Sequence, residues 1–118
     1  MAEEADGIQR DALSLVPSSG KAFLDGQPLS LTRTEFGLLV FLARSNGRVC
    51  ARKEIIEAIQ GPDYPVTERS IDGHVMELRR KLGDYGRVIE TVRGAGYVYR
   101  THEARALGPS GLQSLSQG

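Results

Sequence analysis

Apolar residues repeat at helical spacing in three segments of the chain. The first stripe follows the spacing i, i+3, i+4, i+7 and consists of Phe36, Leu39, Val40 and Ala43. Thr32 and Glu35 stand just before it at the spacing of a capping box, in which each side chain bonds the other residue's amide. The pattern predicts a mostly buried helix that starts after Thr32 and stops at Ser45-Asn46-Gly47.

Two further helices follow along the chain. Residues 52–60 carry three isoleucines on one side, which predicts a short helix before the break Gly61-Pro62-Asp63-Tyr64-Pro65. Thr67 and Ser70 predict the capped start of the next helix, and Gly83-Asp84 predicts its end. The core stripe of this third helix consists of Ile71, Val75, Leu78 and Leu82.

Short extended segments flank the helices. In residues 13–31, two extended runs surround Asp25-Gly26, a dipeptide that favours a tight hairpin because both residues tolerate positive φ. We expect a small antiparallel sheet there, with Pro28 on an edge strand. Residues 88–100 have two β-rich arms around Arg93-Gly94-Ala95-Gly96, which predicts a second hairpin with a basic, glycine-rich tip.

The order of these elements predicts the fold class. A small sheet, three helices and a final hairpin make an α/β (α+β) chain with the arrangement of a winged helix-turn-helix. In that arrangement the third helix enters the DNA major groove and the hairpin, or wing, lies alongside. We expect the winged-helix DNA-binding domain to span residues 11–102, with flexible polar tails at residues 1–10 and 103–118.

Composition and charge narrow the classes of function. The 118 residues suffice for one domain, and 15 basic against 15 acidic residues leave no net charge. The charge is unevenly placed, because residues 69–105 carry eight basic and five acidic residues. Cys50 is the only cysteine, so no intrachain disulfide or cysteine-based metal cage can form. The chain has neither a long apolar segment nor a secretory signal, which indicates a cytoplasmic protein that does not contact a membrane.

Groups that could carry catalysis are sparse. The sequence shows no nucleophile with a matching base, no paired carboxylates and no cluster of metal ligands at the usual spacing. We therefore expect no catalytic residue, no metal and no cofactor.

The third helix has an outer face that needs explanation. Opposite its core stripe lie Arg69, Gly73, Met76, Glu77 and Arg80. A glycine costs an exposed helix about 1 kcal/mol relative to alanine, and close approach to another surface would explain why it is kept. We expect this helix to sit deep in a DNA groove, with Glu77 accepting a hydrogen bond from a cytosine while Arg69 and Arg80 meet phosphates.

Three motifs give the chain a family resemblance. LTRTEFGLL, RSIDGHVMELRRKL and TVRGAGY stand in the order and at the spacing of the patterns LTxxExxLL, RSIDxHVxxLRRKL and TVRGxGY. Over residues 11–100 the chain resembles the C-terminal effector domain of OmpR/PhoB-type response regulators of two-component systems. The resemblance implies a four-stranded N-terminal sheet, a third helix that reads the major groove of promoter DNA, and a wing arginine in the minor groove.

The resemblance also implies particular site residues. The residues that would face bases are Gly73, His74 and Glu77. Those that would contact phosphates are Arg69, Arg79, Arg80, Thr91 and Tyr97. Arg93 would enter the minor groove. The expected working unit is a homodimer on adjacent half-sites, arranged head to tail on direct repeats.

Two questions stay open at this point. The resemblance implies that the loop of Gly61, Pro62, Asp63, Tyr64 and Pro65 contacts RNA polymerase, while a rigid connector explains the same prolines equally well. A winged helix can also contact a protein, which the neutral total charge and the acids Asp72 and Glu77 allow. No receiver domain is present, so the chain is either an effector fragment or a receiver-less regulator.

Overall fold

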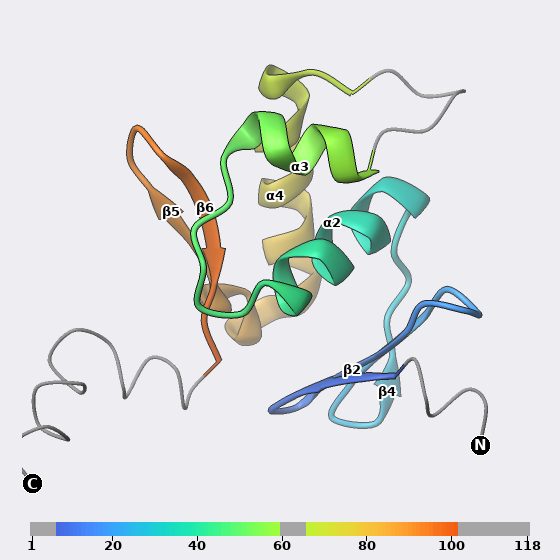
Figure 1. The fold of residues 1–118 in the computed structure, drawn as a ribbon. Helices are drawn as coiled ribbons and strands as arrows, with labels where there is room; N and C mark the ends of the chain where they lie inside the picture. The colour runs from blue at the N-terminus through green and yellow to red at the C-terminus, as the bar shows by residue number, and fades with distance from the viewer. Residues whose placement is uncertain (1–6, 60–65, 102–118) are drawn as a thin grey trace, which may run out of the picture.

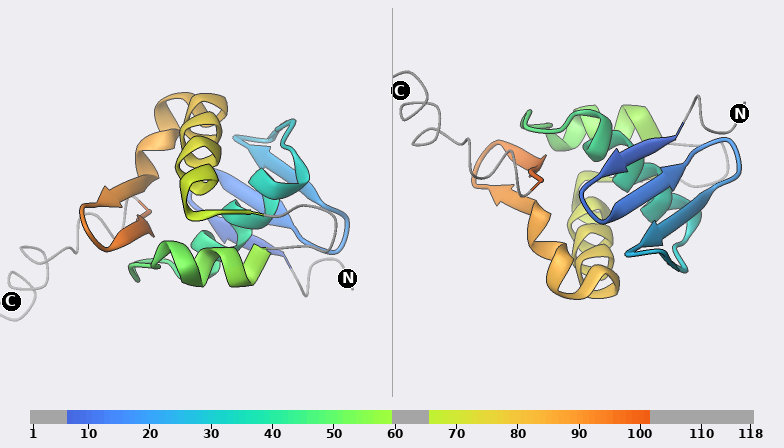
Figure 2. Two further views of the ribbon diagram at one scale, coloured as in Figure 1. Left: turned by 90° about the horizontal axis from the view of Figure 1, so that it is seen from above. Right: turned by 90° about the horizontal axis from the view of Figure 1, so that it is seen from below.

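The fold has a sheet and a hairpin at opposite ends, with helices between them (Figures 1 and 2). The computed structural model describes residues 7–59 and 66–101. Its elements, in order, are β1 (Ile8–Arg10), β2 (Leu13–Val16), β3 (Lys21–Leu24), β4 (Gln27–Pro28), α2 (Arg33–Arg44), α3 (Arg52–Ile59), α4 (Glu68–Leu82), the 3-10 helix η1 (Gly83–Val88), β5 (Ile89–Val92) and β6 (Gly96–Tyr99). The predicted order of sheet, three helices and hairpin is confirmed. No described helix is both long and apolar enough to cross a membrane.

The N-terminal sheet is antiparallel with its strands in sequence order, β1-β2-β3-β4. Asp25 and Gly26 form the two-residue turn between β3 and β4, with φ values of 52° and 79°. Both residues therefore adopt the positive φ that the Asp-Gly pattern predicts. Pro28 lies on β4, an edge strand, where its missing amide leaves no gap in the ladder.

The first strand corrects the expected tail. Residues 8–10 were expected to be flexible, but β1 pairs with β2 and Ile8 is buried opposite Leu15. Distant groups hold Arg10: its Nε donates to the Ala43 carbonyl at 3.0 Å, and its own carbonyl accepts from the Tyr85 hydroxyl at 2.6 Å. A three-residue strand that is held by contacts with distant residues has no recognisable local sequence pattern. The sheet therefore begins before residue 11, where the domain was expected to start.

Capping boxes are present at the starts of α2 and α4, where the sequence predicted a capping box and a capped helix start, respectively. The Glu35 amide donates to Thr32 Oγ1 at 3.1 Å, and the Thr32 amide donates to the Glu35 carboxylate at 2.9 Å. Thr67 and Ser70 exchange the equivalent pair of bonds at 2.9 and 3.1 Å. Each box satisfies amides that the first turn of a helix leaves without a partner, which explains where α2 and α4 begin.

The core lies where α2, α3 and α4 meet the sheet and the hairpin. Fully buried side chains from every layer contribute to it: Leu13, Leu15, Leu38, Leu39, Leu42, Ile55, Ile71, Val75, Leu78, Leu82, Ile89 and Tyr99. All four residues of the predicted stripe of α4 belong to this set. One side of α4 is thus anchored in the core, so its opposite side faces outward.

An ion pair with a buried carboxylate joins α4 to the start of α2. Lys81 Nζ donates to the Glu35 carboxylate at 2.7 Å, and Glu35 is only 3% exposed. Burial by itself would raise the pKa of Glu35, but the hydrogen bonds from Lys81 and Thr32 lower it below its ordinary value of 4.5. Because the folded state favours the carboxylate, the pair stabilises the fold above pH 4.5 and this contribution is lost as the pH falls below it.

Glu35→Gln tests this linkage through the free energy of unfolding. At pH 7 the variant should be less stable than the wild type by about 1–3 kcal/mol, because Lys81 loses its charged partner. The difference should shrink as the pH is lowered from 5 to 3. Glu57→Gln is the matched control, because Glu57 is an exposed acid of α3, and we expect a change below about 0.5 kcal/mol. A Glu35→Gln deficit that does not change with pH would contradict the linkage.

Candidate nucleic-acid interface

The outer face of α4 is open to solvent along its length. Arg69, Gly73, Met76 and Arg80 are exposed on it, and His74 and Glu77 are half-buried. An added Cβ at Gly73 would meet nothing within 4 Å, so no contact inside the protein requires a glycine there. The side chain of Met76 is 71% exposed, and among the described residues it is the one large hydrophobic side chain that faces solvent. The face therefore combines positive charge, an apolar group and a bare stretch of backbone.

Glu77 and Arg80 bind each other on this face. The Arg80 guanidinium donates to the Glu77 carboxylate one turn earlier. This bond lowers the pKa of Glu77 and raises the pKa of Arg80. Helical spacing would also allow Glu77 to pair with Lys81 four residues on, but Lys81 binds Glu35 instead. In the unliganded protein, the proposed base acceptor and a proposed phosphate donor thus neutralise each other.

The wing carries its arginine at the tip. Arg93 is exposed in a turn that the Ala95 amide closes by donating to the Val92 carbonyl at 2.9 Å. Gly94 has a φ of 76°, as the third residue of a type II turn requires. The predicted glycine-rich tip is confirmed, and it presents Arg93 away from the core.

Backbone bonds attach the wing to the body of the domain. Tyr97 pairs with Cys50, with N–O distances of 2.7 and 3.0 Å in the two directions. Gly96 has a φ of 144°, and a Cβ there would overlap the Cys50 carbonyl oxygen. The close approach of β6 to the segment before α3 therefore depends on a glycine at position 96.

Arg79 ties α4 to the other strand of the wing. Its guanidinium donates to the Ile89 carbonyl from two nitrogens, at 2.7 and 2.9 Å, and to Thr91 Oγ1 at 2.9 Å. Arg79 and Thr91, two of the five residues expected to contact phosphates, thus bind each other. This arrangement places them together between α4 and β5 and gives Arg79 a structural role that the sequence did not predict.

Tyr97 is buried and is surrounded by charge. Its hydroxyl donates to Asp72 at 2.6 Å, and Asp72 also accepts from Arg52 Nε at 2.7 Å. Burial and the bond to Asp72 raise the pKa of Tyr97. Arg52 and Asp72 were not among the expected site residues, because no local pattern relates residues 52, 72 and 97. Tertiary packing brings the three together.

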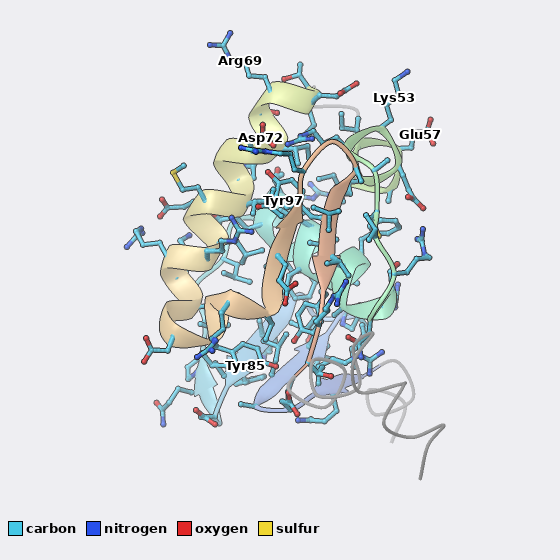
Figure 3. All side chains as sticks on the ribbon, turned by 90° about the vertical axis from the view of Figure 1, so that its left-hand side faces the viewer. Lys53, Glu57, Arg69, Asp72, Tyr85 and Tyr97 are labelled. Atoms are coloured by element: carbon cyan, nitrogen blue, oxygen red, sulfur yellow. The ribbon has the colours of Figure 1, made fainter. Side chains whose placement is uncertain are left out.

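The structure brings most of the expected residues onto one side of the molecule. Arg69 through Arg80 share α4, and Thr91, Arg93 and Tyr97 share the wing that packs beside it. The loop of Gly61, Pro62, Asp63, Tyr64 and Pro65, expected to contact polymerase, lies outside the described residues. Arg69 stands at the first turn of α4 and points away from the body (Figure 3).

A match to a known protein family identifies the family of this chain. The family described as "Transcriptional regulatory protein, C terminal" matches residues 26–99. The chain belongs to this family. Its resemblance to OmpR/PhoB-type effector domains is therefore confirmed.

Curated relatives of this chain are longer regulatory proteins. The transcriptional regulatory protein VxrB of Vibrio cholerae is 44% identical over 85 residues, which are 72% of this chain and 34% of VxrB. The phosphate regulon protein PhoB of Escherichia coli is 35% identical over 96 residues, 80% of this chain and 42% of PhoB. The chain thus spans less than half the length of these relatives.

Solved structures agree with the fold. The DNA binding domain of CpxR from E. coli has a TM-score of 0.70 and 37% identity, over 80% of this chain and 96% of that one. The RstA DNA-binding domain of Klebsiella pneumoniae, solved in complex with the RstA box, has a TM-score of 0.71 and 29% identity, over 81% and 98% of the two chains. The winged-helix fold predicted from the sequence is confirmed.

Proposed function

We propose that this chain binds double-stranded DNA sequence-specifically as the effector domain of a two-component transcriptional response regulator. One structural observation gives the main support. The outer face of α4 and the wing tip with Arg93 are both exposed, and hydrogen bonds of Arg79 and Tyr97 connect α4 to the wing. An α-helix fits the major groove, and an arginine on a wing can enter the adjacent minor groove. The RstA domain solved with its DNA box supports this assignment.

The roles on DNA follow from this placement. Gly73, His74 and Glu77 face base edges, Arg93 enters the minor groove, and the phosphate contacts come from Arg69, Arg79, Arg80, Thr91 and Tyr97. Arg69 carries more of the phosphate contact than Arg79 and Tyr97, which already bond within the protein. Arg80 also has a partner, Glu77, and reaches a phosphate once that bond opens. DNA must also compete with Arg80 for Glu77. Base recognition by Glu77 therefore releases Arg80 toward a phosphate.

Selection from a randomised duplex library tests the proposal. The wild type should enrich one motif, and its affinity should fall with salt by a slope of roughly −0.9 for each phosphate contacted. Arg93→Ala should weaken binding to the selected site by about tenfold. Glu77→Ala should relax preference at one base pair while sequence-independent affinity stays equal or rises, because Arg80 loses its acidic partner. A protein that enriches no sequence and shows no salt dependence is an interaction module for protein partners instead.

The proposal extends to partners and location. Two copies on adjacent half-sites are the proposed working unit, arranged head to tail on direct repeats, and the selected motif should then contain a repeated element. The proposed setting is the cytoplasm, where a bacterial-type regulator meets its promoters. Both statements rest on the family relationship rather than on a contact within this chain.

RNA polymerase is the proposed partner of the loop from Gly61 to Pro65. Tyr64→Ala should leave affinity for the selected DNA unchanged within about twofold, because Tyr64 belongs neither to α4 nor to the wing strands. Transcription from a promoter that carries the selected site should fall at equal occupancy. Unchanged transcription at equal occupancy would show that the loop is only a connector.

A further inference from the structure

Four side chains join α3, α4 and both strands of the wing. Asp72 on α4 accepts hydrogen bonds from Arg52 of α3 at 2.7 Å and from the Tyr97 hydroxyl of β6 at 2.6 Å. The guanidinium groups of Arg52 and Arg79 lie 5.2 and 5.7 Å from the centre of the Tyr97 ring. Figure 3 shows Asp72 and Tyr97 facing each other between α4 and the hairpin. We call this group, Arg52, Asp72, Arg79 and Tyr97, the wing clamp.

The clamp attaches the wing at two points. Arg79 holds β5 through Ile89 and Thr91, the first and third residues of that strand. Asp72 holds β6 through Tyr97, one residue after the glycine that follows the tip turn. A hairpin attached to α4 through each of its strands has little freedom to tilt. The position of Arg93 relative to α4 is then set before any DNA is bound.

The negative charge of Asp72 is unexpected on a surface that is proposed to bind DNA. Its side chain is 49% exposed on the side of the molecule proposed to meet phosphates. The hydrogen bonds from Tyr97 and Arg52 lower the pKa of Asp72, so the group is ionised at neutral pH. A carboxylate there weakens attraction to DNA. Its two short bonds to α3 and the wing supply a function that offsets this electrostatic disadvantage.

We propose that Asp72 is a positioning residue that sets the wing, and with it Arg93, against α4 so that major and minor groove are read as one unit. The inference rests on the proposed DNA-binding function. Asp72 contacts no DNA in this mechanism; it acts through Tyr97 and Arg52. Its removal therefore has two opposed effects. Sequence-independent attraction to DNA rises because a negative charge is lost, while specific affinity falls because the wing is no longer held.

A double-mutant cycle on the selected duplex tests the proposal. Asp72→Ala should lower the ratio of specific to nonspecific affinity by about tenfold, a typical size for a coupled contact. In the wild-type background Arg93→Ala is expected to cost about tenfold in affinity, and in the Asp72→Ala background this loss should shrink to about threefold or less. Thermal unfolding of each variant defines a temperature at which all are folded, and the binding assays are done there.

Asp72→Asn is the matched control. It removes the same charge as Asp72→Ala but keeps a carbonyl oxygen that can accept from Tyr97 and Arg52. We expect Asp72→Asn to keep most of the specificity ratio and the full effect of Arg93→Ala. The proposal is overturned if the two Asp72 variants behave alike, or if Asp72→Ala and Arg93→Ala losses simply multiply. If the proposed DNA-binding function itself is wrong, the wild type enriches no duplex. That result is distinguishable from the outcomes above, and it would also overturn the inference about Asp72.

Discussion

Gly96→Ala should lower the free energy of unfolding by about 3 kcal/mol or more. Two separate costs add at this position. The backbone has a φ of 144°, a region that L side chains rarely adopt. A Cβ would also overlap the Cys50 carbonyl oxygen and lie 2.9 Å from Ala51 Cα, backbone atoms that cannot rotate away. To make room, β6 would have to give up its bonds to Cys50, so the wing would loosen as the fold weakens.

Gly94→Ala is the control for Gly96→Ala. Gly94 also has a positive φ, 76°, but a Cβ there meets nothing within 4 Å. Only the conformational cost remains, about 1–2 kcal/mol. Chemical denaturation of both variants measures the difference. Equal destabilisation would mean that the contact between β6 and Cys50 is not tight, and that the wing is attached mainly by side chains.

Gly73→Leu should separate folding from DNA binding. Because the space around Gly73 is open, leucine fits the free protein and should raise the free energy of unfolding by up to about 1 kcal/mol through its better helix propensity. On DNA, the added side chain occupies the space that the proposed close approach requires. We expect affinity for the duplex selected by the wild type to fall by roughly thirtyfold, which corresponds to about 2 kcal/mol of steric cost.

Gly73→Ala provides the graded control. Alanine has the highest helix propensity, so its single methyl group should stabilise the helix at least as much as leucine does while weakening binding by only a fewfold. A new library selection with Gly73→Leu should yield a motif changed at the base pairs nearest residue 73. Full affinity of Gly73→Leu for the original duplex would show that the helix backbone does not approach the groove closely at this point.

Short-range rules predicted most of the secondary structure. The pairs Thr32–Glu35 and Thr67–Ser70 act across three residues, and Asp25-Gly26 acts within two, so their geometry is independent of the rest of the chain. The missed elements have no such local determinant. β1 is held by Tyr85 and Ala43, and η1 follows a Gly83 that was expected only to end a helix.

The site was predictable in position but not in its internal contacts. The outer face of α4 follows from the stripe of Ile71, Val75, Leu78 and Leu82, because burying one side of a helix exposes the other. The hydrogen bonds of Arg79 and Asp72 join residues 10 to 25 positions apart. Long side chains can reach many partners, and helical spacing does not choose among them.

The sequence by itself determined which three segments form α-helices, where α2 and α4 begin, which side of α4 enters the core, and that a basic tip ends the hairpin. Those features depend on side chains a few residues apart. The tertiary structure alone decided that Lys81 pairs with Glu35, that Asp72 holds Tyr97, and that Gly96 lies against Cys50. These pairs form only when packing of the common core brings distant segments within bonding distance, because an ion pair or a backbone contact acts over a few ångströms.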